Sequence, residues 1–248
     1  MITFNVAKLA STVVLTSVLG SMAFAQNEYA LKGEVGVAAY HTPAITRTTD
    51  RSHNVLPYVY ADYGPFYARI NTLGYKAMPL GAGHLELATR ITLEGYNSAQ
   101  SGIGDRASPM PVGVGTFQKT PYGAFFAYAF HDTQSGGSLL DITYAAKFNV
   151  AGFSIYPQLG VERRSAKYVQ HLYGVSAAES VASGLTAYAG HSDVAPNAGI
   201  TVSYPLSAKY SLSYQFRKKW FDSGITDSPL VQNKSQSTSF LALTREFQ

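Results

Sequence analysis

Residues 84–94 alternate between apolar and polar side chains almost without a break. One face carries Leu85, Leu87, Thr89, Ile91 and Leu93, and the other carries His84, Glu86, Arg90, Thr92 and Glu94. Side chains of a β-strand point alternately to its two sides, so this segment predicts a strand with one apolar and one charged face. The pattern recurs in further segments, and a soluble sandwich could not easily bury so many charges. We therefore expect a β-barrel with lipid outside and polar side chains inside.

The first 25 residues have the layout of a cleavable signal peptide. Lys8 supplies a positive charge, residues 9–19 form a short apolar run, and Ala23-Phe24-Ala25 is a small-x-small cleavage site. Cleavage after Ala25 leaves residues 26–248 as one outer-membrane barrel domain, and it lowers the formal net charge from +4 to +3 because Lys8 is the only charged residue removed. The predicted location is the cell outer membrane of a Gram-negative bacterium.

Composition argues against several other classes of protein. No stretch of the mature chain approaches the roughly 18 consecutive apolar residues of a transmembrane helix. The sequence has no cysteine, which excludes disulfides, thiolate metal sites and an acylated lipoprotein anchor. Charged residues are only 14% of the chain, against 18 tyrosines and 13 phenylalanines, a balance typical of aromatic side chains at membrane interfaces. The modest positive charge does not indicate a nucleic-acid partner.

No linker or low-complexity tract divides the chain, so we expect one all-β domain of strands and turns. The predicted strands are 31–41, 54–62, 65–73, 83–94, 109–118, 121–131, 138–148, 152–163, 167–175, 196–204, 209–220 and 236–247. They predict a transmembrane antiparallel barrel of about 12 strands.

Longer connections are expected at residues 42–53, 95–108, 176–195 and 221–234. Long loops of such barrels gather at one end, and the connection at 95–108 fits that rule poorly. If it and the weak strands at 109–118 and 167–175 do not belong to the membrane wall, the count falls to about ten.

Pro57 and Pro157 lie inside two predicted strands. Because proline has no N–H, each removes a donor from the strand ladder, so we expect a bulge or irregular pairing at both positions. The strand at 209–220 gives a clear assignment of faces. Its outward face carries Tyr210, Leu212, Tyr214, Phe216 and Trp220, and its inward face carries Ser211, Ser213, Gln215 and Arg217.

Charged residues on the predicted inner faces are candidates for lining the lumen. They are Glu86, Arg90, Glu94, Asp141, Lys147 and Glu162. In one interpretation they line a water-filled pore. In the other they pair across the interior and fill it, because a barrel of about 12 strands can be open or filled.

Two basic clusters are candidates for contact with lipopolysaccharide. One contains Arg163, Arg164 and Lys167, and the other contains Arg217, Lys218 and Lys219. Guanidinium groups bind phosphate through paired hydrogen bonds, which favours a site at the membrane edge. The alternative is that both clusters are solvated strand ends.

No constellation predicts catalysis, a cofactor or a metal. The six histidines are dispersed, without the spacing that places two ligands on one strand face. Residues His131, Asp132 and Ser135 invite comparison with lipid-cleaving barrels, but Asp132 to Gly137 is also ordinary turn chemistry. The glycine pairs at 102–104 and 113–115 lack a nucleotide-binding frame. We therefore predict no catalytic, cofactor-binding or metal-binding residue.

Two short motifs carry a resemblance to a known family. Tyr173-Gly174-Val175-Ser176 is followed by Glu179 and a loop centred on Tyr188, and Asp227-Ser228-Pro229-Leu230-Val231 comes later. Together they resemble the MipA/OmpV family of MltA-interacting outer-membrane proteins. The resemblance extends over most of residues 31–247. It carries over Tyr173, Gly174, Val175, Ser228 and Pro229 as family marks with a structural role.

The resemblance implies an outer-membrane barrel whose named member is a scaffold for a lytic transglycosylase and a murein synthase. Other members look like adhesins or proteins of osmotic and antibiotic responses. Our leading hypothesis is a non-enzymatic barrel that docks these periplasmic enzymes in contact with membrane lipid and lipopolysaccharide. The alternatives are a small-solute channel or a surface adhesin, and a lipid-active enzyme is the weakest hypothesis.

Overall fold

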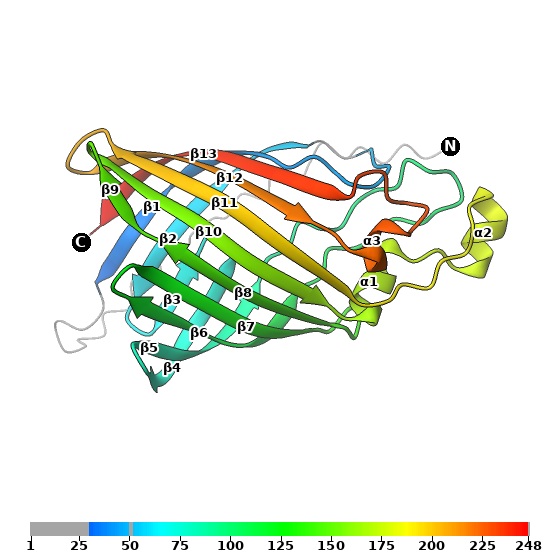
Figure 1. Ribbon diagram of the computed structural model, residues 1–248, viewed down its shortest axis with the longest axis horizontal. Coiled ribbons are helices and arrows are strands. Elements are labelled where there is room, and N and C mark those ends of the chain that lie inside the picture. Colours follow the sequence, from blue (N-terminus) through cyan, green and yellow to red (C-terminus); the bar gives the residue numbers. More distant parts are fainter. Residues whose placement is uncertain (1–29, 50–51, 248) are drawn as a thin grey trace, which may run out of the picture.

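The protein is a closed antiparallel β-barrel (Figure 1). The computed structural model describes residues 30–49 and 52–247, so the expected signal peptide lies outside the described residues. The strands are β1 (Leu31–His41), β2 (His53–Tyr63), β3 (Phe66–Arg69), β4 (Thr72–Leu80), β5 (Gly83–Arg90), β6 (Pro111–Thr120), β7 (Gly123–Asp132), β8 (Ser138–Ala146), β9 (Phe148–Val150), β10 (Phe153–Arg164), β11 (Asp193–Pro205), β12 (Tyr210–Trp220) and β13 (Ser235–Phe247). The helices are α1 (Ala166–Tyr173), α2 (Ala177–Ser183) and α3 (Ser223–Thr226).

Each strand pairs with the next, and β13 pairs with β1 to close the wall. β8 and β9 both pair with β10 in one continuous register, so these two segments form a single strand of the wall. The barrel therefore has 12 strands, which confirms the predicted fold class. Within the described residues, no helix is long and apolar enough to cross a membrane.

The irregular pairing expected at the two prolines is confirmed at Pro157 and is not found at Pro57. Pro157 of β10 lies opposite the break between β8 and β9, where the ladder lapses. The pairing of β2 with β3 covers only Tyr60–Tyr63, because β3 ends at Arg69, where the chain turns into β4. β2 keeps its full pairing with β1 on the other side.

The predicted strand 167–175 is wrong, because most of it belongs to the helix α1 (Ala166–Tyr173). Tyr168, Val169, Leu172 and Tyr173 are buried, and their spacing of one, four and five residues matches one helical face. This short segment also fits an alternating pattern, so the apolar face of the helix was not recognised from the sequence. The predicted strand at 109–118 is confirmed as β6, so the count does not fall to ten.

A strand that sequence reasoning missed replaces the lost one. The predicted strand 65–73 divides into β3 and the start of β4, which turn at Ile70 and Asn71. Ile70 has a φ of 58°, a conformation that β-branched residues rarely adopt, so the turn carried no recognisable signal. β4 also contains a register shift between Lys76 and Met78, which breaks the alternation there.

The connections separate the barrel into two ends. The turn end carries the short turns at residues 64–65, 81–82, 121–122, 151–152 and 206–209, together with the last residues of β13. The loop end carries the long loops 42–52, 91–110, 165–192 and 221–234, which include all three helices (Figure 1). With β4 counted, the loop after β5 lies at the same end as the other long loops, so the misfit predicted near 95–108 disappears.

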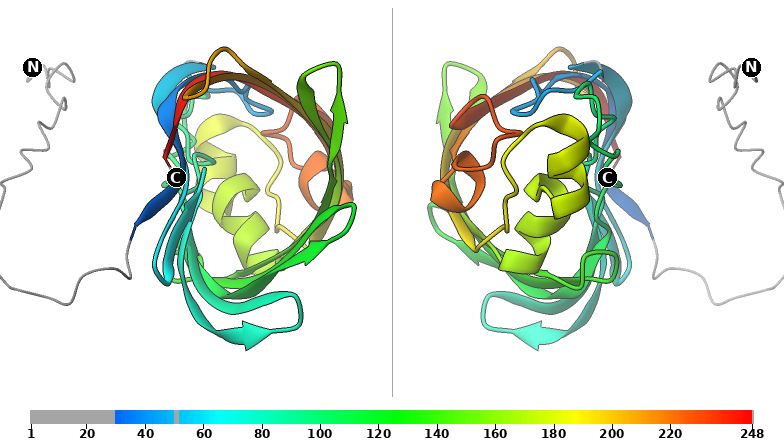
Figure 2. Two further views of the ribbon diagram at one scale, coloured as in Figure 1. Left: turned by 90° about the vertical axis from the view of Figure 1, so that its left-hand side faces the viewer. Right: turned by 90° about the vertical axis from the view of Figure 1, so that its right-hand side faces the viewer.

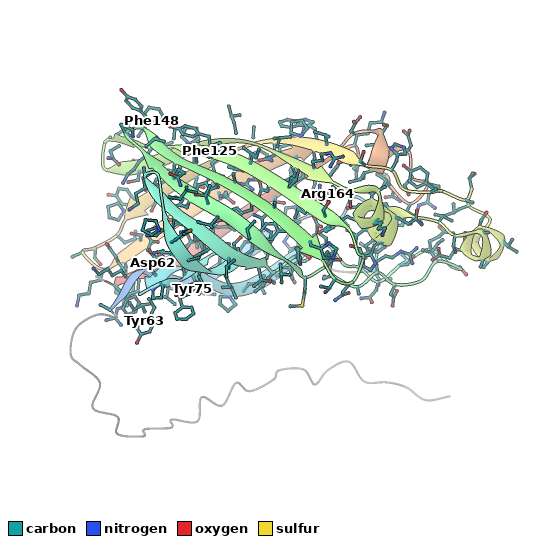
Figure 3. All side chains as sticks on the ribbon, turned by 90° about the horizontal axis from the view of Figure 1, so that it is seen from below. Asp62, Tyr63, Tyr75, Phe125, Phe148 and Arg164 are labelled. Carbon is teal, nitrogen blue, oxygen red and sulfur yellow. The ribbon has the colours of Figure 1, made fainter. Side chains whose placement is uncertain are left out.

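The two faces of the wall have the chemistry expected from alternation. Glu86 of β5 is fully buried inside, whereas its neighbour Leu87 is 51% exposed outside. Tyr210, Leu212, Tyr214, Phe216 and Trp220 of β12 are exposed on the outer face, as predicted. Side chains such as Tyr75 and Phe148 project from the wall (Figure 3). An apolar outer band and a polar interior are the signature of a membrane barrel.

Candidate functional site

The loop end of the barrel is closed by α1, which lies across the mouth (Figure 2). Its residues Tyr168, Val169 and Leu172 are fully buried. They belong to one apolar cluster with Phe130 and Leu139 of the wall. Burial of this helical face fixes α1 inside the barrel rim, because each large apolar side chain removed from water contributes about 1.5–3 kcal/mol.

The family marks meet in the cap, the name we give to loops 91–110, 165–192 and 221–234 together with the helices α1, α2 and α3. The Ser228 hydroxyl donates to the carbonyl of Tyr173 at 2.6 Å and accepts from the N–H of Leu230 at 3.2 Å. Val175 pairs with Tyr188 as an isolated bridge. Val175 and Leu230 share a small buried apolar cluster. These residues therefore lie in one packed unit, although Tyr173 and Ser228 are 55 positions apart in the sequence.

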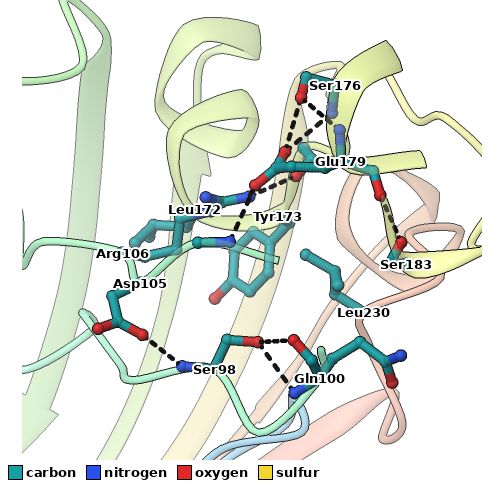
Figure 4. A network of polar contacts seen from close by, with 12 residues as sticks. Ser98, Gln100, Asp105, Arg106, Leu172, Tyr173, Ser176, Glu179, Ser183 and Leu230 are labelled. Atoms are coloured by element: carbon teal, nitrogen blue, oxygen red, sulfur yellow. Dashed lines mark hydrogen bonds and ion pairs between the residues drawn. The ribbon is translucent and has the colours of Figure 1, made fainter. Parts of the chain in front are cut away.

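Arg106 and Glu179 join the loop after β5 to α2 (Figure 4). The guanidinium of Arg106 lies 2.8 Å from the Glu179 carboxylate and also donates to the carbonyl of Gly174 at 3.0 Å. Glu179 completes a capping box with Ser176 at the start of α2. Burial raises the pKa of the Glu179 carboxyl, but hydrogen bonds from Ser176 and Arg106 outweigh that effect and lower the pKa to about 2.

Two tyrosines connect the remaining parts of the cap. The Tyr96 hydroxyl donates to the carbonyl of Leu172 at 2.7 Å, and the Tyr188 hydroxyl donates to the carbonyl of Gly224 in α3 at 2.8 Å. All three long loops after β5 are thus bonded to one another. The cap is a specific folded structure and not a set of independent loops.

A layer of ion pairs lies directly beneath α1. Arg164 is almost fully buried and contacts Glu94 at 2.6 Å and Glu162 at 2.8 Å. Lys219 approaches Glu162 at 2.7 Å, and the Tyr168 hydroxyl donates to Glu94 at 2.8 Å. Burial raises the pKa of Glu94, but attraction to Arg164 and Lys219 outweighs burial and lowers it. This layer joins the cap to strands β10 and β12.

A second buried network crosses the interior on the other side of the barrel. Both terminal nitrogens of Arg69 donate to Glu86 at 2.9 Å. The Tyr128 hydroxyl donates to Glu86 at 2.6 Å and accepts from Arg69 at 2.9 Å. Arg90 approaches Asp141 at 2.6 Å. Such bidentate, charge-assisted contacts hold β3, β5 and β7 in fixed positions.

The structure brings most of the predicted lumen residues together in pairs. Five of the six candidates take part in interior ion pairs: Glu86, Arg90, Glu94, Asp141 and Glu162. Lys147 lies 5.9 Å from the ring centre of Tyr156 instead. The pairing corresponds to the filled interpretation of the interior. Arg69 and Tyr128, which complete these networks, were not predicted from the sequence. Arg69 follows Tyr67 by two residues, so alternation places both side chains on the same face of β3, the inner one.

The two basic clusters are divided between the faces of the wall. Arg164 and Lys219 point inward to Glu162, and Arg217 points inward and donates to Gln158 at 2.7 Å. Their positions do not allow contact with lipopolysaccharide outside the barrel. Arg163 and Lys167 are exposed, and Lys218 is partly exposed, which leaves these three as candidates for that contact. Adjacent strand residues such as Arg163 and Arg164 point to opposite faces. Interpreting them as one cluster did not take this rule into account.

The residues considered for lipid hydrolysis do not converge. His131 is exposed on β7, whereas its neighbour Asp132 is buried. Asp132 accepts hydrogen bonds from the backbone N–H groups of Met110 and Ser135, at 2.9 Å and 2.7 Å. The Ser135 hydroxyl accepts from the N–H of Gly137. These contacts are those of a turn. Within the described residues, no group of three His, Cys, Asp or Glu side chains could hold a metal ion.

Solvent reaches the interior from the turn end. Tyr60 points inward, since its strand partner Arg69 binds Glu86 inside, yet it is 38% exposed. Other inward side chains of this half are partly exposed: Phe117, Phe126, Tyr156, Gln158, Thr201 and Gln215. Inward side chains near the cap, such as Glu162 and Arg164, are buried. We call the solvent-reached half the turn-end lumen.

Comparison with known proteins gives consistent matches over nearly the whole chain. A family model described as MltA-interacting protein MipA matches residues 35–247. The putative outer membrane protein YiaT of Escherichia coli K12 is 24% identical over 231 residues, which cover 90% of this chain and 94% of that protein. The MltA-interacting protein of the same strain is 24% identical over 248 residues, covering 97% and 98%.

Two further matches were found. Outer membrane protein Omp26La of Vibrio anguillarum is 21% identical over 208 residues, which cover 81% of this chain and 80% of that protein. Among solved structures, the outer membrane channel DcaP of Acinetobacter baumannii aligns with a TM-score of 0.37 and 8% identity, covering 89% of this chain and 97% of that chain.

Proposed function

Because this chain belongs to the MipA family of MltA-interacting proteins, we propose that it is a non-enzymatic outer-membrane barrel that docks periplasmic murein enzymes. The protein is an outer-membrane protein, because its relatives are named outer membrane proteins and its fold is a β-barrel with an apolar outer face. A relative is named for interaction with MltA, and a murein-cleaving and a murein-synthesising enzyme are the partners we propose here.

The observation that carries the proposal is the closure of the loop end. The cap packs into the mouth, and ion pairs around Glu162 and Arg164 fill the interior beneath it. A through-pore needs a hydrated path lined by unpaired groups, and these contacts argue against one. The closed interior supports a role in which the barrel anchors and orients partners at the membrane.

The short turns are the surface available to periplasmic partners, since short turns of outer-membrane barrels face the periplasm. Tyr122 in the turn between β6 and β7 is 76% exposed. Tyr63, Phe148 and Leu206 are also exposed at this end. Exposed aromatic and aliphatic side chains on turns supply the apolar anchors on which protein interfaces depend.

A pull-down from envelope extract tests the proposal. We expect the tagged mature protein to recover a lytic transglycosylase and a murein synthase, and Tyr122→Ser to recover less of both. Val181→Ser is the matched control, because Val181 in α2 is 89% exposed at the opposite end. Recovery of no murein enzyme by the unmodified protein would count against docking.

A surface adhesin is the second candidate, and α2 is the observation that favours it. None of its residues is buried, and it stands away from the barrel at the end that faces outside (Figure 1). Adhesion to a host or phage surface that is lost in Val181→Ser but kept in Tyr122→Ser would favour this candidate. The channel alternative predicts stepwise conductance in planar bilayers, where we expect none.

Contact with lipopolysaccharide is proposed for the exposed basic side chains alone. Arg163, Lys167 and Lys218 lie at or near the loop end of β10, α1 and β12. A cation at this level can pair with phosphates of the outer leaflet. Replacement of all three by glutamine should reduce copurification of lipopolysaccharide with the barrel, and unchanged copurification would remove the proposal.

A further inference from the structure

The turn-end lumen has walls of two kinds. Strands β10, β11 and β12 contribute neutral hydrogen-bonding groups. Gln158 and Gln215 both donate to the hydroxyl of Thr201, at 3.1 Å and 2.9 Å, and Ser213 donates to Ser203 at 2.9 Å. This wall presents hydroxyl and amide groups that can exchange hydrogen bonds with a polyhydroxylated ligand.

The remaining wall contributes aromatic rings and also the carboxylate of Glu34, which lies on β1 directly opposite Tyr60 and accepts a hydrogen bond from the Thr244 hydroxyl at 2.9 Å. Tyr60 stands on β2, and Phe117 and Phe126 pack at 5.0 Å between ring centres on β6 and β7. The Arg69 guanidinium lies over the ring of Phe117 at 4.5 Å and fixes its orientation. Binding sites for small molecules combine aromatic surface with a few placed polar groups, which is the composition found here.

Arg217 lies where the turn-end lumen meets the buried layer. Among the ion pairs of residues 30–49 and 52–247, Arg217 takes part in none. Its terminal nitrogen donates to the amide oxygen of Gln158 at 2.7 Å, and its Nε is buried without a hydrogen-bond partner. The other interior arginines, Arg69, Arg90 and Arg164, each contact a carboxylate. Within the part of the chain that the structure describes, Arg217 is therefore a positive charge inside the barrel that pairs with no carboxylate.

We propose that the turn-end lumen binds a glycan that carries a carboxylate, with Arg217 binding the carboxylate and Tyr60 packing against a sugar ring. Sugars present an apolar ring face to aromatic side chains and hydroxyls to amides and alcohols, which matches the two walls. A guanidinium binds a carboxylate through two parallel hydrogen bonds, which supplies the selectivity for an acidic sugar.

The inference deepens the proposed function and rests on it, because in a barrel that docks periplasmic enzymes the turn end faces the periplasm and the murein. Murein is the acidic glycan present in that compartment, with carboxylates on its muramic acid residues. A barrel that docks murein enzymes would then hold their substrate at the same end.

Isothermal titration of the refolded mature barrel in detergent tests the proposal. The probes are the disaccharide of N-acetylglucosamine and N-acetylmuramic acid, and diacetylchitobiose, which has similar rings without the carboxylate. We expect the acidic disaccharide to bind about tenfold or more tightly than the neutral one, the difference that a hydrogen bond to a charged group contributes. Failure of the acidic probe to bind, or equal affinity for both, would overturn the inference.

Variants separate the charge from the aromatic surface. Arg217→Gln should lower affinity for the acidic probe to that for the neutral one, whereas Tyr60→Ala should weaken both. Arg163→Gln, which removes an exposed arginine from β10, is the matched control and should change neither. Migration of unboiled samples on a gel verifies that each variant is folded. Binding that survives Arg217→Gln contradicts the assignment.

The outcome is independent of the docking experiment. A barrel that recovers murein enzymes but ignores the acidic disaccharide refutes the lumen site and leaves docking supported. A barrel that binds the disaccharide but recovers no enzyme supports the lumen site and refutes docking.

Discussion

Replacing Glu86 by glutamine should destabilise the barrel far more than an equivalent change in an exposed pair. Glu86 is fully buried and accepts two bonds from Arg69 at 2.9 Å and one from Tyr128 at 2.6 Å. Glutamine keeps the size of the side chain but removes its charge. The Arg69 guanidinium, only 9% exposed, would then lack its counter-charge inside the wall.

The magnitude follows from that burial. Removing one partner of a buried ion pair costs about 3–5 kcal/mol, because the remaining charge stays desolvated. The amide can still accept one bond, so we expect the lower part of this range, about 3 kcal/mol for Glu86→Gln. That value corresponds to roughly a hundredfold change in the ratio of folded to unfolded protein.

Asp62→Asn is the matched control. Asp62 of β2 pairs with Lys76 of β4 at 3.0 Å, on the far side of β3, but the Asp62 side chain is 47% exposed. Exposed pairs contribute about 0–1 kcal/mol. Urea unfolding in detergent, followed by the fluorescence of the single tryptophan Trp220, measures both variants. Equal effects of the two substitutions would refute the argument from burial. The double variant of Arg69 and Glu86 to methionine should recover most of the loss.

Three further predictions concern the cap. Ser228→Ala leaves the carbonyl of Tyr173 without its 2.6 Å partner in a buried position, so it should cost about 1–3 kcal/mol and increase proteolysis of residues 165–192 without releasing the wall strands. Gly174→Ala should disrupt the end of α1, because a Cβ there would collide with the last turn of the helix. Gly104→Ala should be tolerated, since the atom nearest to its added Cβ lies 3.5 Å away. Hydrogen exchange of the cap compares the two variants. The pKa of Glu179 is lowered to about 2 from its usual 4.5, so its contribution to stability is present above about pH 4.5 and is lost as pH falls toward 2. Pepsin cleavage near residues 177–190 should therefore increase between pH 4 and pH 2, and Glu179→Gln should be cleaved readily at both; identical profiles would contradict this.

The wall could be predicted from the sequence because its signal is local. Alternation assigns each side chain to lipid or lumen within its own strand, and it placed Glu86 and Leu87 on the correct faces. Pro157 marked a break in pairing for an equally local reason, the missing N–H, whereas Pro57 lies in a regularly paired part of β2. The same rule failed at residues 167–175, where a short segment fitted both a strand and a helix and only burial against the wall selected the helix.

The candidate sites depended more strongly on the tertiary structure. The family marks near Tyr173 and Ser228 were visible in the sequence, but their contact across 55 positions was not. Arg106 stands in a loop without periodicity, so nothing in its neighbourhood indicated Glu179 as its partner. The two basic clusters were treated as units, and the pleat of β10 and β12 divided each of them between inside and outside.

The sequence by itself determined a strand-built, cysteine-free membrane wall with an apolar outer face and a charged inner face, since these properties follow from residue type and a period of two. The tertiary structure alone decided which inner charges meet. Closing 12 strands into a ring brings Arg164 to Glu94 across 70 positions, and among the described residues it leaves Arg217 bonded to the amide of Gln158 and to no carboxylate. Pairing across a barrel depends on strand number and register, which no local pattern contains.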